Sequence, residues 1–90
     1  MLMGGISMSM IFFTYRAQTQ ARQGASILRE AGIQGRLDRT PAKLAVNGCG
    51  FGLWVPATQA YGAALELRGR NCPYERSYKV DGNAVKVVTL

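Results

Sequence analysis

The order of strand-like and helical segments is the feature that most constrains the fold of this 90-residue chain. Runs rich in β-branched and aromatic residues predict strands, and apolar residues at helical spacing predict helices. The pattern reads strand, helix, strand, strand, helix, strand, strand, over residues 9–15, 19–31, 33–38, 50–55, 58–68, 74–80 and 84–90. Two β-α-β units in this order predict an α+β fold, a ferredoxin-like split βαβ sandwich (βαββαβ) with an extra C-terminal hairpin strand. We expect the sheet order 5-4-1-3-2, with both helices on one face.

Turn and capping residues mark the ends of several of these segments. Thr19 can cap the start of the first helix, and Gly32 fits the position that follows its end. Pro56 is expected to stop the third strand just before the second helix. Asp81-Gly82 is a strong signal for a two-residue hairpin turn, which predicts that the last two strands pair with each other.

Charge and residue usage limit the classes of function. Eleven Lys and Arg residues against five Asp and Glu give a net charge of +6, which favours anionic partners. The basic residues are scattered, so most of them are expected on a solvated surface. The chain has no histidine, the commonest general base and zinc ligand, and its two cysteines cannot build a zinc site alone. We therefore expect neither a metal nor a cofactor.

The length of the chain is that of a single domain. We expect this domain over residues 9–90, preceded by a flexible N-terminal extension over residues 1–8. The opening residues lack the basic region of a secretory signal, and no stretch approaches the ~18 apolar residues of a membrane span. These observations predict a cytoplasmic protein with reduced cysteines.

Cys49 lies among glycines in the segment Asn47–Gly52, at the expected start of the third strand. Glycines leave the sulfur uncovered and allow backbone N–H groups to face a negative charge. The expected topology brings this position to one sheet edge with Arg16, Arg68, Arg70 and the N-terminus of the first helix. Such surroundings lower the pKa of a cysteine thiol from about 8.5 toward neutrality. The alternative is that Cys49 is a buried small hydrophobe at a strand start.

Cys72 precedes the fourth strand and is expected at the same edge of the sheet. It could be a buried packing residue or a resolving thiol for Cys49, and we favour packing. The first strand separates the two strand starts by about 10 Å, at ~4.8 Å per strand. A direct disulfide between Cys49 and Cys72 would therefore need loop movement.

Four aromatic residues could lie either on the open face of the sheet or in the core: Phe12, Phe13, Phe51 and Trp54. Base stacking is one use of aromatic residues on a sheet of this architecture. The segment Gly50–Val55 only echoes the motif typical of RNA-binding modules, so nucleic acid is disfavoured as a partner. Core packing or dimerisation through the sheet face is favoured instead, and Phe13, Trp54 and the terminal strand predict a homodimer.

Four segments together resemble a known family: Phe12–Tyr15, Ala25–Ile33, Thr40-Pro41 and Cys49–Leu53. Their order and spacing are similar to those of the selenium/sulfur carrier-like family, long described as the domain of unknown function DUF3343. The resemblance covers roughly residues 10–80. Its sharpest element is a Cys-Gly pair after a Thr-Pro loop, which corresponds to Cys49 and Gly50.

The resemblance implies a carrier or accessory protein rather than a stand-alone enzyme. A donor of the cysteine desulfurase or selenocysteine lyase type would load sulfur or selenium onto Cys49, and the persulfide or selenosulfide would pass to an acceptor protein. Three glycines would allow close approach, and three cations would stabilise the anion or steer a partner: Gly48, Gly50, Gly52, Arg16, Lys43 and Arg70. The alternative is a non-catalytic dimerising or small-ligand-binding module of ferredoxin-like fold, in which Cys49 is structural.

Overall fold

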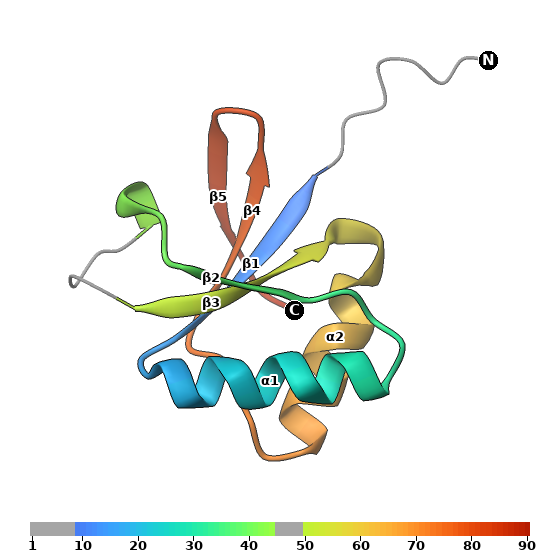
Figure 1. Ribbon diagram of the computed structural model, residues 1–90. Coiled ribbons are helices and arrows are strands. Elements are labelled where there is room, and N and C mark those ends of the chain that lie inside the picture. The colour runs from blue at the N-terminus through green and yellow to red at the C-terminus, as the bar shows by residue number, and fades with distance from the viewer. Residues whose placement is uncertain (1–8, 45–49) are drawn as a thin grey trace.

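A five-stranded antiparallel sheet with two helices on one face forms the body of the protein in the computed structural model, which describes residues 9–44 and 50–90 (Figure 1). Its elements are β1 (Met10–Tyr15), α1 (Gln18–Glu30), β2 (Arg36–Arg39), a 3-10 helix (Ala42–Leu44), β3 (Phe51–Pro56), α2 (Ala57–Gly69), β4 (Ser77–Asp81) and β5 (Ala84–Val88). The sheet order is β2-β3-β1-β4-β5, which confirms the predicted order and the ferredoxin-like α+β class. The expected N-terminal extension over residues 1–8 lies outside the described residues.

Strand β1 is central and is buried on both faces. Its side chains alternate, as in any strand, so Ile11, Phe13 and Tyr15 face the helices while Phe12 faces the other side. Phe12 and Phe13 both have 0% of their surface exposed. A strand that is covered on both faces needs a continuous apolar run, which explains why the sequence Met-Ile-Phe-Phe predicts the centre of a sheet.

The main core lies between the sheet and the helices, and small residues bring the layers together. Helix α2 buries Ala60, Ala63 and Ala64 beside a single large residue, Leu67. A Cβ atom added to Gly24 of α1 would lie 2.9 Å from Leu53 Cδ1 and 3.3 Å from Leu67 Cδ2. The absence of a side chain at Gly24 therefore allows α1 to pack closely against β3 and α2.

A second, smaller core covers the middle of the opposite sheet face. Phe12, Tyr78 and Leu44 of the 3-10 helix are buried together there, and Trp54 and Val80 pack against them. The Phe12 and Trp54 rings lie with their centroids 4.6 Å apart. The segment after β2 therefore has a packing role, because its Leu44 covers the centre of the sheet face opposite the helices. The sequence patterns predicted that this face is open.

The end of α1 confirms the role predicted for Gly32. Gly32 has φ +76°, its N–H donates to the Arg29 carbonyl, and the N–H of Ile33 donates to the Leu28 carbonyl. This pair of hydrogen bonds is the Schellman arrangement. It also explains why β2 begins at Arg36 rather than at the predicted Ile33, since the Ile33 amide is used to close the helix.

The start of α1 differs from the prediction. The helix begins at Gln18, so Thr19 lies inside its first turn, and the capping position is Ala17, which makes no side-chain hydrogen bond. The prediction that Thr19 caps the helix is therefore wrong. The first N–H groups of α1 consequently lack a capping side chain at the N-cap position.

A buried hydrogen bond ties β1 to the chain that follows α2. The Tyr15 hydroxyl donates to the Cys72 carbonyl at 2.7 Å, and Tyr15 is 2% exposed. Burial, reinforced by the hydrogen bond to Cys72, raises the pKa of Tyr15 well above its ordinary value. The folded structure therefore favours the neutral form of the Tyr15 phenol.

Replacing Tyr15 by phenylalanine tests this contact through the pH dependence of stability. Because the folded-state pKa is raised, the stabilisation is complete below about pH 10 and is lost as the pH rises above that value. Tyr15→Phe should lower the free energy of unfolding by about 1 kcal/mol at neutral pH, since the Cys72 carbonyl loses its donor. The variant should also lose less of its free energy of unfolding than the wild type as the pH rises above about 10.

Urea denaturation at several pH values measures both effects. Tyr61→Phe is the matched control, because Tyr61 is 65% exposed and should behave like the wild type. Equal losses of stability above pH ~10 in Tyr15→Phe and wild type would contradict the assignment.

Candidate functional site

Gly50, which is bonded to Cys49, lies at the end of the sheet where strand β1 ends. Its carbonyl accepts a hydrogen bond from the Thr40 amide at 2.9 Å. A Cβ atom added to Gly50 would lie 3.2 Å from the Tyr15 carbonyl oxygen and 3.3 Å from the Thr40 hydroxyl oxygen. Gly50 is thus held between the end of β1 and the chain that leaves β2. Cys49 and Gly48 lie outside the described residues.

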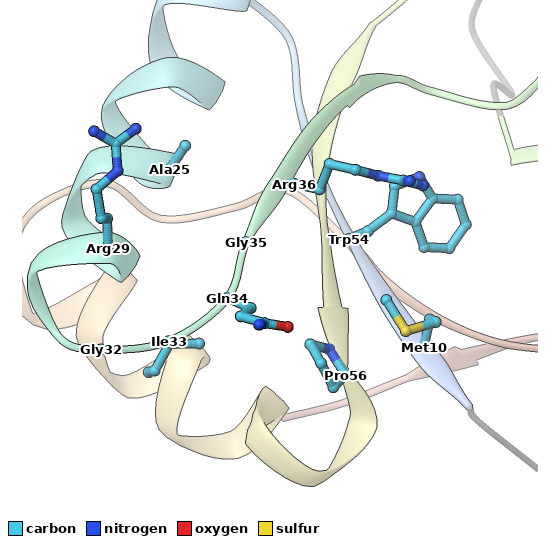
Figure 2. A pocket seen from close by; sticks show the side chains of 10 residues that line it. All are labelled: Met10, Ala25, Arg29, Gly32, Ile33, Gln34, Gly35, Arg36, Trp54 and Pro56. Atoms are coloured by element: carbon cyan, nitrogen blue, oxygen red, sulfur yellow. The ribbon is translucent and has the colours of Figure 1, made fainter.

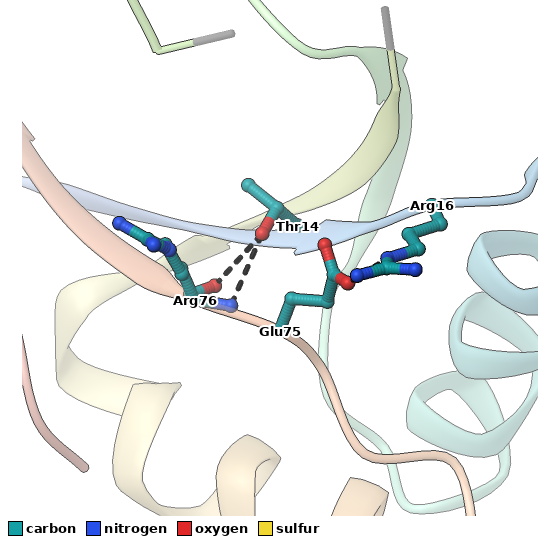
Figure 3. A network of polar contacts seen from close by, with 4 residues as sticks. All are labelled: Thr14, Arg16, Glu75 and Arg76. Carbon is teal, nitrogen blue, oxygen red and sulfur yellow. Dashed lines mark hydrogen bonds and ion pairs between the residues drawn. The ribbon is translucent and has the colours of Figure 1, made fainter. Parts of the chain in front are cut away.

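Two of the predicted cations follow the segments that contact Gly50, since Arg16 comes after Tyr15 and Lys43 comes three residues after Thr40. Arg16 follows β1 directly, and its side chain is 85% exposed and forms an ion pair with Glu75 (Figure 3). Lys43 lies exposed on the 3-10 helix and makes no ion pair within residues 9–44 and 50–90. The positive charge of Arg16 is therefore partly balanced by the Glu75 carboxylate, whereas Lys43 has no such partner among the described residues.

A second contact holds the start of β4 at the same edge. The Thr14 hydroxyl accepts a hydrogen bond from the Arg76 amide at 3.1 Å and donates to the Arg76 carbonyl at 3.4 Å (Figure 3). The backbone of Glu75 adds a further bond, from its N–H to the Thr14 carbonyl at 2.8 Å. These bonds fix the backbone of the residue that pairs with Arg16.

Arg70 makes its contacts with the two helices. Its guanidinium lies 2.8 Å from a Glu30 carboxylate oxygen and 3.4 Å from one of Glu66. Glu30 is the last residue of α1, whereas Gly50 lies at the edge where β1 ends and α1 begins. The structure therefore brings Arg70 to the helix layer and records no contact of its side chain with Gly50 or Arg16.

Cys72 is a core residue. It is 4% exposed, and its sulfur lies 3.4 Å from the Gln20 carbonyl oxygen of α1. Its own carbonyl receives the Tyr15 hydroxyl. Strand β1 lies between β3 and β4, as the sequence predicted. This burial supports the packing role, because thiol exchange at Cys72 would require α1 to move away from the sulfur.

Gly52 has an internal role that differs from the predicted one. A Cβ atom at this position would overlap the Phe13 carbonyl oxygen and would lie 2.5 Å from the Phe12 ring. The glycine therefore lets the Phe12 ring lie across β3. Its lack of a side chain is therefore needed for packing inside the molecule.

The aromatic residues divide between the two cores. Phe12 and Phe13 are fully buried, so neither can stack on a base or form part of a dimer surface. Trp54 is half-buried, and its indole N–H donates to a carboxylate oxygen of Asp38 at 3.1 Å. Among these aromatic residues of the open sheet face, Trp54 is the one that can contact a ligand.

The opposite end of the sheet carries a pocket that sequence patterns did not predict (Figure 2). It has a volume of about 690 Å³ and lies between the end of α1, the start of β2 and the end of β3. Arg29, Arg36 and Trp54 are among its lining residues. The sequence gives little indication of this pocket, because its lining residues come from three different elements and form no motif.

Two features are absent from the part of the chain that the structure describes. In residues 9–44 and 50–90, no group of three or more His, Cys, Asp and Glu side chains could hold a metal ion. None of the helices in these same ranges has the length and apolar character needed to cross a bilayer.

Comparisons with known proteins found no matching family model, no matching curated protein and no matching solved structure. The resemblance to the DUF3343 family is therefore carried by sequence segments alone, Phe12–Tyr15, Ala25–Ile33, Thr40-Pro41 and Cys49–Leu53.

Substitution of Gly52 tests its internal role. Gly52→Ala should lower the free energy of unfolding by about 2 kcal/mol, because the new methyl group has no space beside Phe12 and Phe13. Gly62→Ala is the control: Gly62 is exposed on α2, and a Cβ atom there would meet its nearest neighbour at 3.9 Å. Alanine at that position should be neutral or stabilising by up to about 1 kcal/mol. Urea denaturation compares the two variants, and equal stabilities would show that Gly52 is not packed as described.

Proposed function

We propose that this protein is a carrier that holds sulfur or selenium on Cys49 as a persulfide or selenosulfide and passes it to an acceptor protein. A cytoplasmic compartment, where thiols remain reduced, suits such chemistry. In the loading step, the Cys49 thiolate attacks the outer sulfur of a persulfide on the donor enzyme. The bond between the two donor sulfurs breaks, the donor leaves as a thiolate, and Cys49 gains one sulfur atom.

The observation that carries the proposal is the Cys49-Gly50 pair after Thr40-Pro41, with Gly50 held at an edge of the sheet. The hydrogen bond from Thr40 and the close approach of the Tyr15 carbonyl fix Gly50 at the point where β1 ends. A loop at the end of a rigid sheet can present a reactive group to two different partner proteins.

Electrostatics at this edge supports a thiolate. The N-terminus of α1 carries about half a positive charge, and its N-cap residue, Ala17, supplies no side-chain acceptor. Arg16 lies two residues before the first residue of this helix, and it forms an ion pair with Glu75. Lys43 adds a cation from the segment that precedes Cys49. Each of these groups favours the anionic over the neutral form of a nearby thiol.

A second candidate function is that of a non-catalytic module that binds a small ligand or dimerises. The pocket beside Trp54 favours ligand binding. Strand β5 favours dimerisation, because it is the outer strand of the sheet and its Val87 is 62% exposed. In either case Cys49 would be structural and would not accept sulfur.

Loading by a donor enzyme separates the two functions. After incubation with a cysteine desulfurase and cysteine, intact-mass spectrometry should show the gain of one sulfur atom on the wild type. Cys49→Ser should show no gain. Cys72→Ala should retain most of it, because Cys72 is buried under α1. A selenocysteine lyase with selenocysteine gives the corresponding test for selenium.

Thermal melts of all three proteins provide the folding control for this experiment. Alanine is chosen at position 72 because it places no unpaired hydroxyl in the core. Persistence of the sulfur gain in folded Cys49→Ser, or its absence from the wild type, would favour the binding module instead.

A further inference from the structure

The pocket at the far end of the sheet has the size and position of a ligand site that is separate from Cys49. It lies where β3 ends at Pro56, whereas Gly50 precedes the start of the same strand. The five residue steps along β3 separate the two ends by about 16 Å, at ~3.3 Å per residue. Its volume of about 690 Å³ falls within the range of small-molecule sites.

Two arginines give this pocket a net positive charge. Figure 2 shows Arg29 on the last turn of α1 and Arg36 at the start of β2, with the backbone of residues 32–35 between them. None of the described residues that line the pocket is acidic, and the Asp38 carboxylate beside it is bonded to the indole N–H of Trp54. Neither guanidinium has a carboxylate partner within residues 9–44 and 50–90, whereas Arg16 and Arg70 do. These two cations are therefore available to an anion from outside the chain.

The same pocket contains an aromatic platform whose orientation is fixed. Trp54 and Arg36 are directly paired across β3 and β2, so their side chains are neighbours on one face of the sheet. The indole packs against Phe12, and its N–H is held by Asp38 at 3.1 Å. Met10 lines the same end of the pocket. A flat ring placed here would contact an indole that is already ordered.

We propose that this pocket binds a small organic anion that carries a flat ring, with the ring against Trp54 and the anionic group at Arg36, while Arg29 adds positive charge from the other side of residues 32–35. Guanidinium groups bind phosphate and carboxylate through charge-assisted hydrogen bonds, and aromatic rings stack on indole. A nucleoside monophosphate has both parts. This binding is independent of sulfur loading, since it uses none of the residues at the Gly50 edge.

Trp54 is the single tryptophan of the chain, so its fluorescence reports directly on the pocket. Titration with AMP should quench this fluorescence and saturate. Adenosine, which lacks the anion, and inorganic phosphate, which lacks the ring, should each bind at least tenfold more weakly than AMP.

A pair of double variants tests the assignment of the cations. Arg29→Gln with Arg36→Gln should weaken AMP binding at least tenfold, which corresponds to about 1.4 kcal/mol. Arg22→Gln with Arg39→Gln is the matched control: it removes the same charge from the same two elements, α1 and β2, but at exposed residues outside the pocket. The control should bind AMP within about twofold of the wild type.

Three results would overturn the proposal. The first is the absence of AMP quenching at millimolar concentration in the folded wild type. The second is equal weakening in the two double variants, which would show attraction by net charge alone. The third is binding of adenosine or phosphate as tight as that of AMP. Circular dichroism of the variants verifies that they are folded, and the outcome does not depend on whether Cys49 accepts sulfur.

Discussion

The burial of β1 on both faces is the constraint on which the rest of the structure depends. Phe13 anchors the strand in the core under the helices, and Phe12 anchors it in the smaller core under Leu44. Strands β3 and β4 both pair with β1, so the position of β1 determines which residues lie together at each end of the sheet. Gly50 and Arg16 lie at its C-terminal end, and Met10 and the arginine pocket lie at its N-terminal end.

This arrangement gives the protein two chemically different ends. One end carries the residue bonded to Cys49, the N-terminus of α1 and the exposed cation Arg16. The other end carries Trp54 with Arg29 and Arg36. A carrier that meets a donor and an acceptor would use the first end, whereas a small anion would occupy the second. The two proposals can therefore be tested, and can fail, separately.

The sequence predicts the fold well because its signals are local. The strand order follows from the alternation of strand and helix patterns, and Gly32 and Gly82 take the left-handed conformations that their turns require. The predicted start of α1 is wrong, because Thr19 is a good capping residue in type but is the second residue of the helix, two residues after the N-cap position. Element boundaries depend on tertiary contacts that no local pattern contains.

The candidate site is predicted less completely, for the same physical reason. The edge position of Gly50 follows from topology alone. The ion pair of Arg70 with Glu66 follows the i,i+4 spacing of a helix, but the pair with Glu30 joins residues distant in sequence, and no spacing rule reveals it. Likewise, the need for glycine at position 52 arises from the Phe12 ring on a neighbouring strand. The pocket at Arg36 was missed because its residues meet only in the folded chain.

The central claim, that Cys49 is a reactive thiolate, is tested most directly by the pH dependence of its alkylation. Iodoacetamide is added to the folded protein at a series of pH values, and peptide mapping follows the rate at Cys49 and at Cys72 separately. If Cys49 is a reactive thiolate, its alkylation rate should be half-maximal near neutral pH, below the pKa of about 8.5 of an ordinary thiol, and Cys72 should be protected. A rate at Cys49 that rises only at or above pH ~8.5, or that is as slow as the rate at buried Cys72, would contradict the carrier function.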